Sequence, residues 1–370
     1  VKYSPYSDEL MVIPPGKSAD WSNTYGVYTA KFTSSDGTVD LGTWLVPNGG
    51  FTEGAFWIKD DLDRAWKRVY SVGYWEDPEE TAGPGVVEWS DDSTDGTYYL
   101  RGEHIHLKGE DKLSADTVIH EYGHNVMWNI YDGWFPTTYC PSPHYINRYS
   151  HPNCAWTEGW ANFFALYAND DPIFTWPSGA SLNLETATWG TSGWDTGDGV
   201  EGRVAGALWD IYDNTNEGYD PYSDGFEEIW DTIFHQNDSN FAEYWSAWKS
   251  RGHNTHDAVR AIYQNTIDYD TAPTVSGIPD QTLSGSSKDV DLFPYTYDPE
   301  STDSQLSFQV TENSNPSCVS ASIVNDRYIR LAPLCTNGSS TITVRTSDGI
   351  KTDTDTFTVT VLAHTVSTPA

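Results

Sequence analysis

The sequence is poor in positive charge, in cysteine and in long apolar runs, and each shortage excludes a class of protein. Lysine and arginine together number 20 against 54 aspartates and glutamates, which gives a net charge of −34 with the histidines neutral. A surface of that sign repels nucleic acid and anionic lipid, so neither is expected as a partner. No stretch approaches the roughly 20 apolar residues of a membrane span. The polar start VKYSPYSDEL is not a signal peptide, so an exported form would be a processed chain.

Only four cysteines are present, and they fall as two local pairs. Cys140 with Cys154, and Cys318 with Cys335, each enclose a short segment. Two local disulfides are typical of an extracellular protein, and the alternative is four buried free thiols. We therefore expect a protein that is secreted or attached to a cell surface.

The apolar and aromatic residues, at 38% and 14% of the chain, are sufficient for more than one core. Apolar runs around Ser-Ser-Asp-Gly near the start predict strands and a hairpin, and helical periodicity then dominates to about residue 266. The later stretch is rich in Ser, Thr, Asp and Val, and its length of about 90 residues is that of an immunoglobulin-like sandwich. The sequence thus predicts a multidomain α+β chain. Its parts are a β-rich segment at 1–53, a mainly helical domain at 54–271, an all-β sandwich at 272–363 and a tail at 364–370.

Periodicity also predicts individual elements within the helical domain. A strand is expected at 97–109, and a helix that carries histidines follows it. Further helices are expected at 60–75, 158–168, 202–213, 226–236, 241–250 and 256–265.

The stretch TVIHEYGHNVMW, residues 117–128, places two histidines four residues apart. On a helix, His120 and His124 project from nearly the same face, so both imidazoles can reach one cation. Glu121 lies beside the first histidine, where it can hold a water molecule and act as a base without ligating. The alternative is two histidines that are hydrogen-bonded on a helix face with a solvated glutamate as neighbour.

A catalytic zinc needs a third protein ligand and one open position for water. Glu158, in the stretch AWTEGWANFFALY, is the best candidate, and the alternative is an exposed carboxylate at a helix start. Asn162 follows it by four residues and shares its helix face, so its side chain can orient a ligand histidine. Gly123, Ala161 and Ala165 are small enough to let the two helices approach closely.

The run DTVIHEYGHNVMW followed by EGWANFF resembles the gluzincin zinc metallopeptidases, particularly the thermolysin-like and fungalysin-like branches. In those enzymes an HExxH helix is completed by a glutamate from a later helix. The stretch GRVAGALWDIYD is similar to a further fungalysin helix, and GEHIHLKG occupies the place of the edge strand above the cleft. The resemblance covers about residues 55–270.

The resemblance implies that His120, His124 and Glu158 bind zinc and that Glu121 is the general base. Asn162 stands where the family usually has aspartate, and it is expected to accept the same hydrogen bond without the charge. The resemblance also implies a supporting role for Asp116, which matches an aspartate four residues before the first histidine. The expected activity is that of a zinc endopeptidase acting on protein or peptide substrates.

The developing oxyanion in such a reaction needs a further hydrogen-bond donor. Tyr149 has an offset from Glu158 similar to that of a family tyrosine with this role. Arg203 and His235 are alternatives, and the sequence does not rank the three.

The substrate is expected to lie extended along GEHIHLKG and to add a strand by backbone pairing. His104 and His106 alternate onto one face of that strand, either as a second metal site or as two exposed histidines. A zinc aminopeptidase is an alternative activity. GEHIHLKG lacks the family's amine-binding motif, although Glu103 or Glu110 remains able to bind an amine.

Two features suggest calcium and adhesion rather than catalysis. Residues 210–225 are rich in oxygen ligands, which suits calcium, although a solvated acidic loop is an equal alternative. The candidate calcium ligands there are Asp210, Asp213, Asp220 and Asp224. The C-terminal stretch resembles cadherin-like modules, in which Asp298, Glu300 and Asp303 are further candidates. That resemblance implies cell-surface attachment or self-association, so a structural or adhesive protein built on a peptidase scaffold is the second hypothesis.

Overall fold

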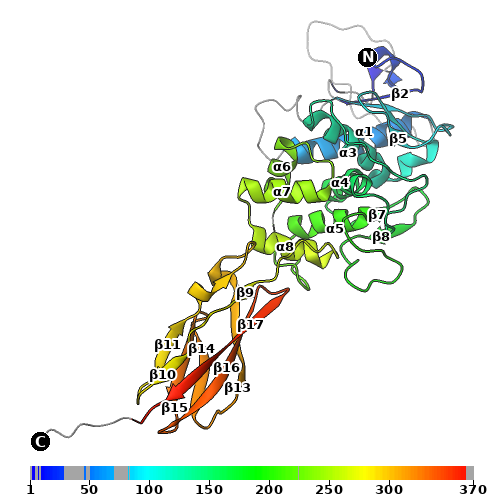
Figure 1. The fold of residues 1–370 in the computed structure, drawn as a ribbon. Helices are drawn as coiled ribbons and strands as arrows, with labels where there is room; N and C mark the ends of the chain where they lie inside the picture. Colours follow the sequence, from blue (N-terminus) through cyan, green and yellow to red (C-terminus); the bar gives the residue numbers. More distant parts are fainter. Residues whose placement is uncertain are drawn as a thin grey trace, which may run out of the picture. The chain divides into compact units, whose positions relative to one another are not determined.

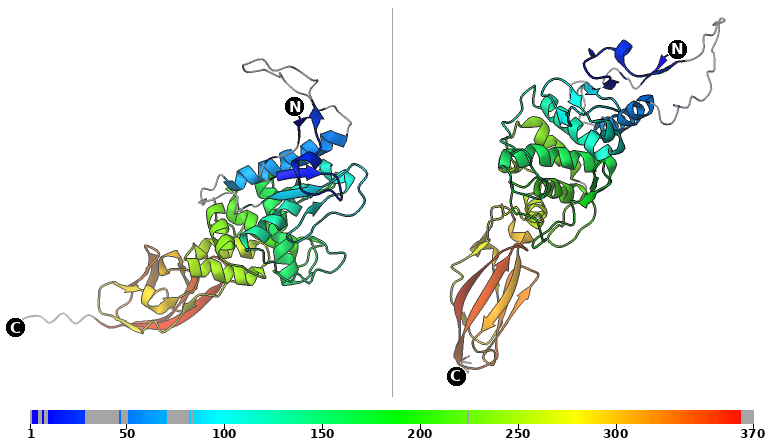
Figure 2. Two further views of the ribbon diagram at one scale, coloured as in Figure 1. Left: turned by 90° about the horizontal axis from the view of Figure 1, so that it is seen from above. Right: turned by 90° about the vertical axis from the view of Figure 1, so that its right-hand side faces the viewer.

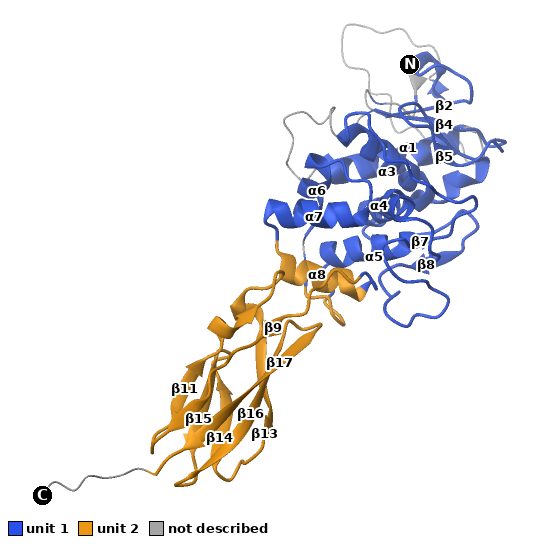
Figure 3. Ribbon diagram, viewed as in Figure 1, with its two compact units in different colours: residues 1–215, 222–253, 265–267 blue, residues 216–221, 254–264, 268–370 orange. Residues whose placement is uncertain are grey.

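The computed structural model describes residues 2–4, 7, 10–28, 46, 51–70, 82, 84–223 and 225–363. Most of the expected N-terminal hairpin and the tail at 364–370 lie outside these residues. Contacts divide the chain into two units (Figure 3). The first comprises 1–215, 222–253 and 265–267, and the second comprises 216–221, 254–264 and 268–370.

A four-stranded sheet of the first unit has the order β2-β4-β6-β5. Its first two neighbouring pairs are parallel, and β5 is antiparallel to β6. Because β2 comes from the N-terminal segment, the expected boundary at 53/54 is wrong: part of that segment is a strand of the helical domain's sheet. The bounds are Leu10–Ile13 for β2, Gly85–Glu88 for β4, Tyr98–Tyr99 for β5 and Ile105–His106 for β6. A separate pair joins β1 (Lys2–Tyr3) to β3 (Val27–Tyr28).

The strand order also corrects the expected edge strand. β6 lies in GEHIHLKG and is paired on both sides, with β4 and with β5. A substrate therefore cannot add to it, because both of its backbone edges already have partners. The edge strand on that side of the sheet is β5.

Among the helices of the first unit, the one expected at 60–75 begins nine residues earlier and the one expected at 158–168 begins six residues earlier. The helices expected at 202–213, 226–236 and 241–250 agree to within one residue. Residues 71–75 of the first expected range lie outside the described residues. Helix starts are fixed by local caps: Ser114 accepts a hydrogen bond from the Thr117 N–H, and His151 accepts one from the Asn153 N–H. The helices are α1 (Phe51–Tyr70), α3 (Ala115–Ile130), α4 (Pro152–Asn169), α5 (Glu201–Tyr212), α6 (Phe226–His235) and α7 (Phe241–Arg251). A short hairpin, β7 (Ile173–Thr175) and β8 (Ser181–Asn183), follows α4.

Helices α3 and α4 pack closely (Figure 1) because small residues face each other. A Cβ atom added at Gly123 would lie 3.1 Å from the Cα atom of Ala161. The Trp160 indole N–H donates to the Gly123 carbonyl over 3.1 Å. Both helices are buried along most of their length, with large aromatic side chains such as Phe163 and Phe164 in the core. This contact brings the two sequence motifs onto facing surfaces.

The second unit contains α8 (Thr255–Gln264) and two main sheets, with orders β10-β17-β16-β13 and β11-β15-β14. The long strands β16 and β17 run side by side (Figure 2). Apolar residues from both sheets form one buried cluster. The strands are β9 (Thr274–Val275), β10 (Gln281–Leu283), β11 (Lys288–Asp291), β12 (Thr296–Tyr297), β13 (Ser307–Asn313), β14 (Val319–Val324), β15 (Tyr328–Pro333), β16 (Gly338–Ser347) and β17 (Thr352–Val361).

The expected division at 271/272 is close to the start of the β-rich part at 268, but it misplaces α8. That helix groups with the strands because its first turn is bonded to the loop after β12. The Thr255 hydroxyl donates to the Glu300 carbonyl over 2.7 Å, and a hydrogen bond of 2.8 Å joins His256 Nδ1 to the Ser301 hydroxyl.

Both expected disulfides are confirmed, with Cys140 bonded to Cys154 and Cys318 bonded to Cys335. In the part of the chain that the structure describes, no helix combines the length and apolar character needed to cross a membrane.

Candidate metal centre

The two histidines of HEYGH project from one face of α3. Their rings meet edge to face, with centroids 4.8 Å apart. Both lie against Glu158 of α4, whose Oε2 is 3.2 Å from His120 Nε2 and 3.4 Å from His124 Nε2. The structure thus brings together the three residues expected to bind zinc.

These distances fit a zinc ion. Ligands at about 2.0–2.1 Å from a tetrahedral zinc lie about 3.3 Å from one another. The two measured distances from Glu158 fall on either side of that value. Two imidazole nitrogens and one carboxylate are also the donor set of catalytic zinc sites, in which a fourth position stays open. The residues present therefore fit the metal.

Charge and hydrogen bonds prepare these side chains for ligation. Burial alone would raise the pKa of Glu158, but the adjacent His124 and His120 hold it well below its usual value. The carboxylate is therefore available as an anion. Asn162 Oδ1 lies 2.9 Å from His120 Nδ1, so the ring donates from Nδ1 and presents Nε2 to the site. This is the orienting contact expected from the sequence.

Glu121 is positioned by β5. The Leu100 N–H donates to the His104 carbonyl of the neighbouring chain segment, and successive N–H groups of a strand point to opposite sides. The Tyr99 N–H therefore points away from the sheet, and it donates to the Glu121 carboxylate. Burial raises the pKa of Glu121 to about 7, against the lowering effect of His120. A carboxylate in that range is suited to accept and return a proton.

A cleft of about 770 Å³ opens over these residues. His120, Glu121 and Glu158 line it, and so does Thr97, directly before β5. Its remaining walls combine acidic residues with the apolar surface of the β7–β8 hairpin. The lining includes Lys108, Glu110, Asp111, Phe174, Trp176, Leu182 and Glu201.

Asp116 is hydrogen-bonded to neighbouring elements of the fold and not to a candidate zinc ligand. Its carboxylate accepts hydrogen bonds from the Asn169 side chain over 2.7 Å and from the Thr175 N–H over 2.8 Å. These bonds join the start of α3 to the end of α4 and to β7. The supporting role expected of Asp116 is therefore to fix this wall of the cleft.

The three residues expected as oxyanion donors do not line the cleft. Tyr149 is 58% exposed, and its backbone N–H binds the Asp195 carboxylate. Arg203 is buried and donates to the carbonyls of Asp195, Ala187 and Thr188. His235 lies at the end of α6, with Nδ1 3.3 Å from the Asp231 carboxylate. Only Tyr149 was expected from its spacing, and its loop is held by Asp195, whereas Arg203 lies within α5 and His235 ends α6.

His104 and His106 share a carboxylate instead of a metal. Glu88 of β4 lies 2.8 Å from His104 Nδ1 and 3.9 Å from His106 Nδ1. The His106 ring also stacks on Tyr98 with centroids 4.6 Å apart. These contacts account for both histidines as part of the sheet surface.

The residues of the expected calcium stretch are divided between the two units. Asp210 and Asp213 belong to the first unit and Asp220 to the second, while Asp224 lies outside the described residues. Calcium binding there stays a prediction from the sequence.

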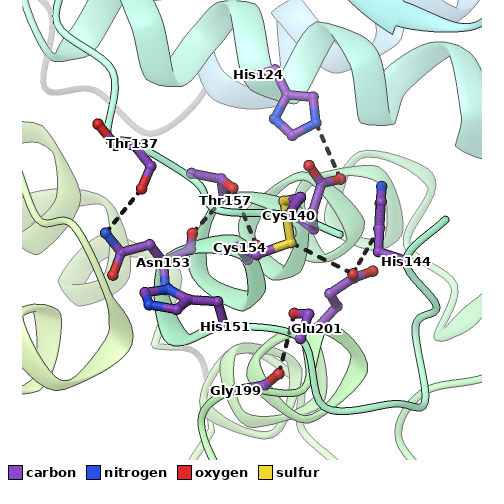
Figure 4. The surroundings of a disulfide bond; sticks show 12 residues. His124, Thr137, Cys140, His144, His151, Asn153, Cys154, Thr157, Gly199 and Glu201 are labelled. Carbon is purple, nitrogen blue, oxygen red and sulfur yellow. Dashed lines mark hydrogen bonds and ion pairs between the residues drawn. A yellow bond between two sulfur atoms is a disulfide. The ribbon is translucent and has the colours of Figure 1, made fainter. Parts of the chain in front are cut away.

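One pair of residues in the cleft carries no sequence signal. His144 lies in the loop between α3 and α4, and its Nδ1 is 2.7 Å from Oε1 of Glu201, the first residue of α5 (Figure 4). The hydrogen bond that His144 donates to Glu201 raises the pKa of His144 to about 9, aided by the charges of Glu158 and Glu121. No motif marks either residue, and 57 positions separate them, so sequence reasoning missed both.

Comparison with known proteins adds a family. Residues 71–266, just over half of the chain, match the family described as Mycolysin C-terminal domain. This is a domain of fungalysin-type metallopeptidases, and its description assigns no catalytic activity by itself. No curated protein matches the sequence.

Two of the solved structures that match cover about a quarter of this chain. The chain is similar to "Endo-fucoidan hydrolase MfFcnA4 from glycoside hydrolase family 107", with 19% identity over 27% of this chain and 16% of that chain, and a TM-score of 0.21. It is also similar to "Chimeric titin Z1Z2 functionalized with a KLER exogenous peptide from decorin", with 17% identity over 26% of this chain and 98% of that chain, and a TM-score of 0.18. At such scores neither similarity carries an argument about fold or function.

Proposed function

The chain belongs to the Mycolysin C-terminal domain family, and on that premise we propose that it is an extracellular zinc-dependent endopeptidase. The observation that carries the proposal is the assembly of His120, His124 and Glu158 at tetrahedral spacing, with Glu121 in the same cleft. The two disulfides agree with an extracellular site of action.

Each residue of the centre has a role that follows from its surroundings. His120, His124 and Glu158 would hold the zinc, which when bound polarises the scissile carbonyl and lowers the pKa of the attacking water. Glu121 accepts the proton of that water and passes it to the leaving amine. The Tyr99 N–H holds the Glu121 carboxylate in place for both transfers.

The peptide substrate is proposed to lie along β5 rather than along β6. Thr97 lies two residues before Tyr99, so its backbone groups point to the same side as the Tyr99 N–H, away from β6. Thr97 also lines the cleft. A substrate in extended form can therefore pair with the backbone of this edge while its scissile bond lies over the metal centre.

The test combines metal content with one substitution. The purified chain is expected to bind one zinc ion and to hydrolyse casein, with loss of hydrolysis on chelation and recovery when zinc is restored. Glu121→Gln keeps the shape of the side chain but removes the base, so hydrolysis is expected to vanish while zinc content and fold are retained. Unimpaired hydrolysis by this variant would show that the mechanism is wrong.

A zinc aminopeptidase is the second candidate, favoured by one observation. Glu110 is exposed and lines the cleft, where it can bind the free amine of a substrate. Glu103, the other residue considered for this role, lines a different hollow. If the enzyme is an aminopeptidase, Glu110→Gln will lose activity on peptides with a free N-terminus and acetylated peptides will be resistant. An endopeptidase cleaves both.

The scaffold hypothesis makes a different prediction for the metal. A peptidase fold kept only for adhesion has no need for a ligand set at zinc distances, yet Glu158 lies within 3.4 Å of both histidines. If the parent chain binds zinc but shows no measurable hydrolysis, the structural alternative is the correct one.

A further inference from the structure

The cleft holds an unexpected histidine beside the metal centre. His144 lines the cleft of about 770 Å³ together with His120, Glu121 and Glu158. It also lines an adjoining hollow of about 260 Å³, where His124 joins the same residues. The ring of His144 therefore lies where both hollows meet the zinc ligands.

The orientation of this ring is fixed by Glu201. The carboxylate of Glu201 belongs to a residue that is 3% exposed, and it accepts a hydrogen bond from His144 Nδ1 over 2.7 Å. The other ring nitrogen, Nε2, is directed away from Glu201, as Figure 4 shows. Within the described ranges, no protein group is hydrogen-bonded to that nitrogen, so it is available as a donor to a bound molecule.

The loop that carries His144 is fixed by one bond before this residue in the sequence and by another after it. Four residues before it, Cys140 is bonded to Cys154 of α4, and the sulfur of Cys154 lies 3.9 Å from Glu201 Oε1. Two residues after it, the Ile146 carbonyl accepts a hydrogen bond from the Gly202 N–H over 2.8 Å. The disulfide and α5 thus hold the imidazole at one place above the cleft floor.

The charge of the ring suits an anion. The carboxylates of Glu201 from α5, Glu158 from α4 and Glu121 from α3 face His144, and the hydrogen bond to Glu201 is the main contact that favours the protonated ring. An imidazolium in this position offers a fixed N–H to negative charge that develops in the cleft, and it needs no rearrangement to do so.

We propose that His144, oriented by Glu201, donates a hydrogen bond from Nε2 to the substrate carbonyl oxygen as that oxygen becomes negatively charged. This inference rests on the proposed peptidase function. It gives His144 the role for which the sequence suggested Tyr149, Arg203 and His235. Glu201 acts through His144 and is a positioning residue.

Kinetics of casein cleavage test the catalytic role. His144→Gln is expected to lower kcat by about 10²–10³-fold with little change in KM, the usual cost of one oxyanion donor. Glu201→Gln is expected to lower kcat less, because the ring keeps its place but loses its ionic partner. His235→Gln is the matched control, since it removes a carboxylate-paired histidine from outside the cleft, and it should leave kcat unchanged. Zinc content should be equal in all four proteins.

A measurement that needs no activity tests the pair itself. In the zinc-free protein with ¹⁵N-labelled histidine, NMR titration is expected to give His144 a pKa of about 9, which falls toward the ordinary 6.5 in Glu201→Gln. A His144→Gln enzyme with normal kcat and zinc content would overturn the inference while leaving the peptidase function intact. A parent protein without any hydrolysis would refute both, and an unshifted His144 pKa would refute the positioning by Glu201.

Discussion

Removal of the Asn162 amide is the sharpest test of how the metal centre is held. The Oδ1 atom of Asn162 is 2.9 Å from His120 Nδ1, and the residue is only 3% exposed, so water has little access to replace it. Loss of a contact of this kind typically lowers metal affinity by about 10–100-fold, or about 1.4–2.8 kcal/mol. Since Asn162 is neutral, and a neutral hydrogen bond contributes about 0.5–1.5 kcal/mol, we expect Asn162→Ala to weaken zinc binding about tenfold.

The assay is zinc competition against a chromophoric chelator at fixed pH. Asn169→Ala is the matched control, because Asn169 is also an α4 amide bonded to α3, through Asp116, but it touches no zinc ligand. It should lose stability without losing zinc affinity. Asn162→Asp should bind zinc at least as tightly as the parent, since a carboxylate raises the basicity of the ring. Equal zinc affinity in Asn162→Ala and the parent, or equal losses in both alanine variants, would refute this account of the contact.

Three further predictions concern stability. Replacing Cys140 and Cys154 by serine opens a loop of 14 residues and is expected to cost about 3 kcal/mol in urea unfolding, whereas an unchanged midpoint would show that the bond contributes nothing. Gly123→Ala gains up to about 1 kcal/mol of helix propensity, but it places a methyl group 3.1 Å from Ala161 Cα, and such overpacking costs about 1–3 kcal/mol. We therefore expect a lower free energy of unfolding, and a more stable variant would contradict the close packing of the two helices. Burial raises the pKa of Asp270 from 3.8 to about 7, so the folded state binds this proton more tightly than the unfolded state does. The contribution of Asp270 to stability therefore falls as pH rises from about 4 to 7. The melting temperature of the second unit should fall over the same range, and Asp270→Asn should make that fall smaller.

Much of the metal centre was predictable because its parts are local. The spacing of His120 and His124 on one helix follows from 3.6 residues per turn, and so does the shared face of Glu158 and Asn162. The small size of Gly123 likewise indicates a close helix contact from the sequence alone. The ranges of α5, α6, α7 and α8 agreed to within one residue for the same reason, since periodicity is a property of consecutive residues.

The errors all concern which segments become neighbours. GEHIHLKG has the residues of an edge strand, but β5 adds to it and covers that edge. Helix α8 has an amphipathic pattern that fits either unit. The hydrogen bond from the Thr255 hydroxyl to the Glu300 carbonyl joins it to the second unit. Tyr149 has a suitable spacing, but its loop is held by Asp195.

The sequence by itself determined the pair of histidines on one helix face, the glutamate beside them and the two disulfides, because each depends on short spacings that covalent geometry constrains. Only the tertiary structure decided that β5 borders the cleft and that His144 meets Glu201 above the metal centre. The pairing of His144 with Glu201 spans 57 positions, and closing such a loop costs nearly the same entropy for many partners. The disulfide, the helix contact at Gly123 and the packing of α5 select one partner from the many that spacing allows.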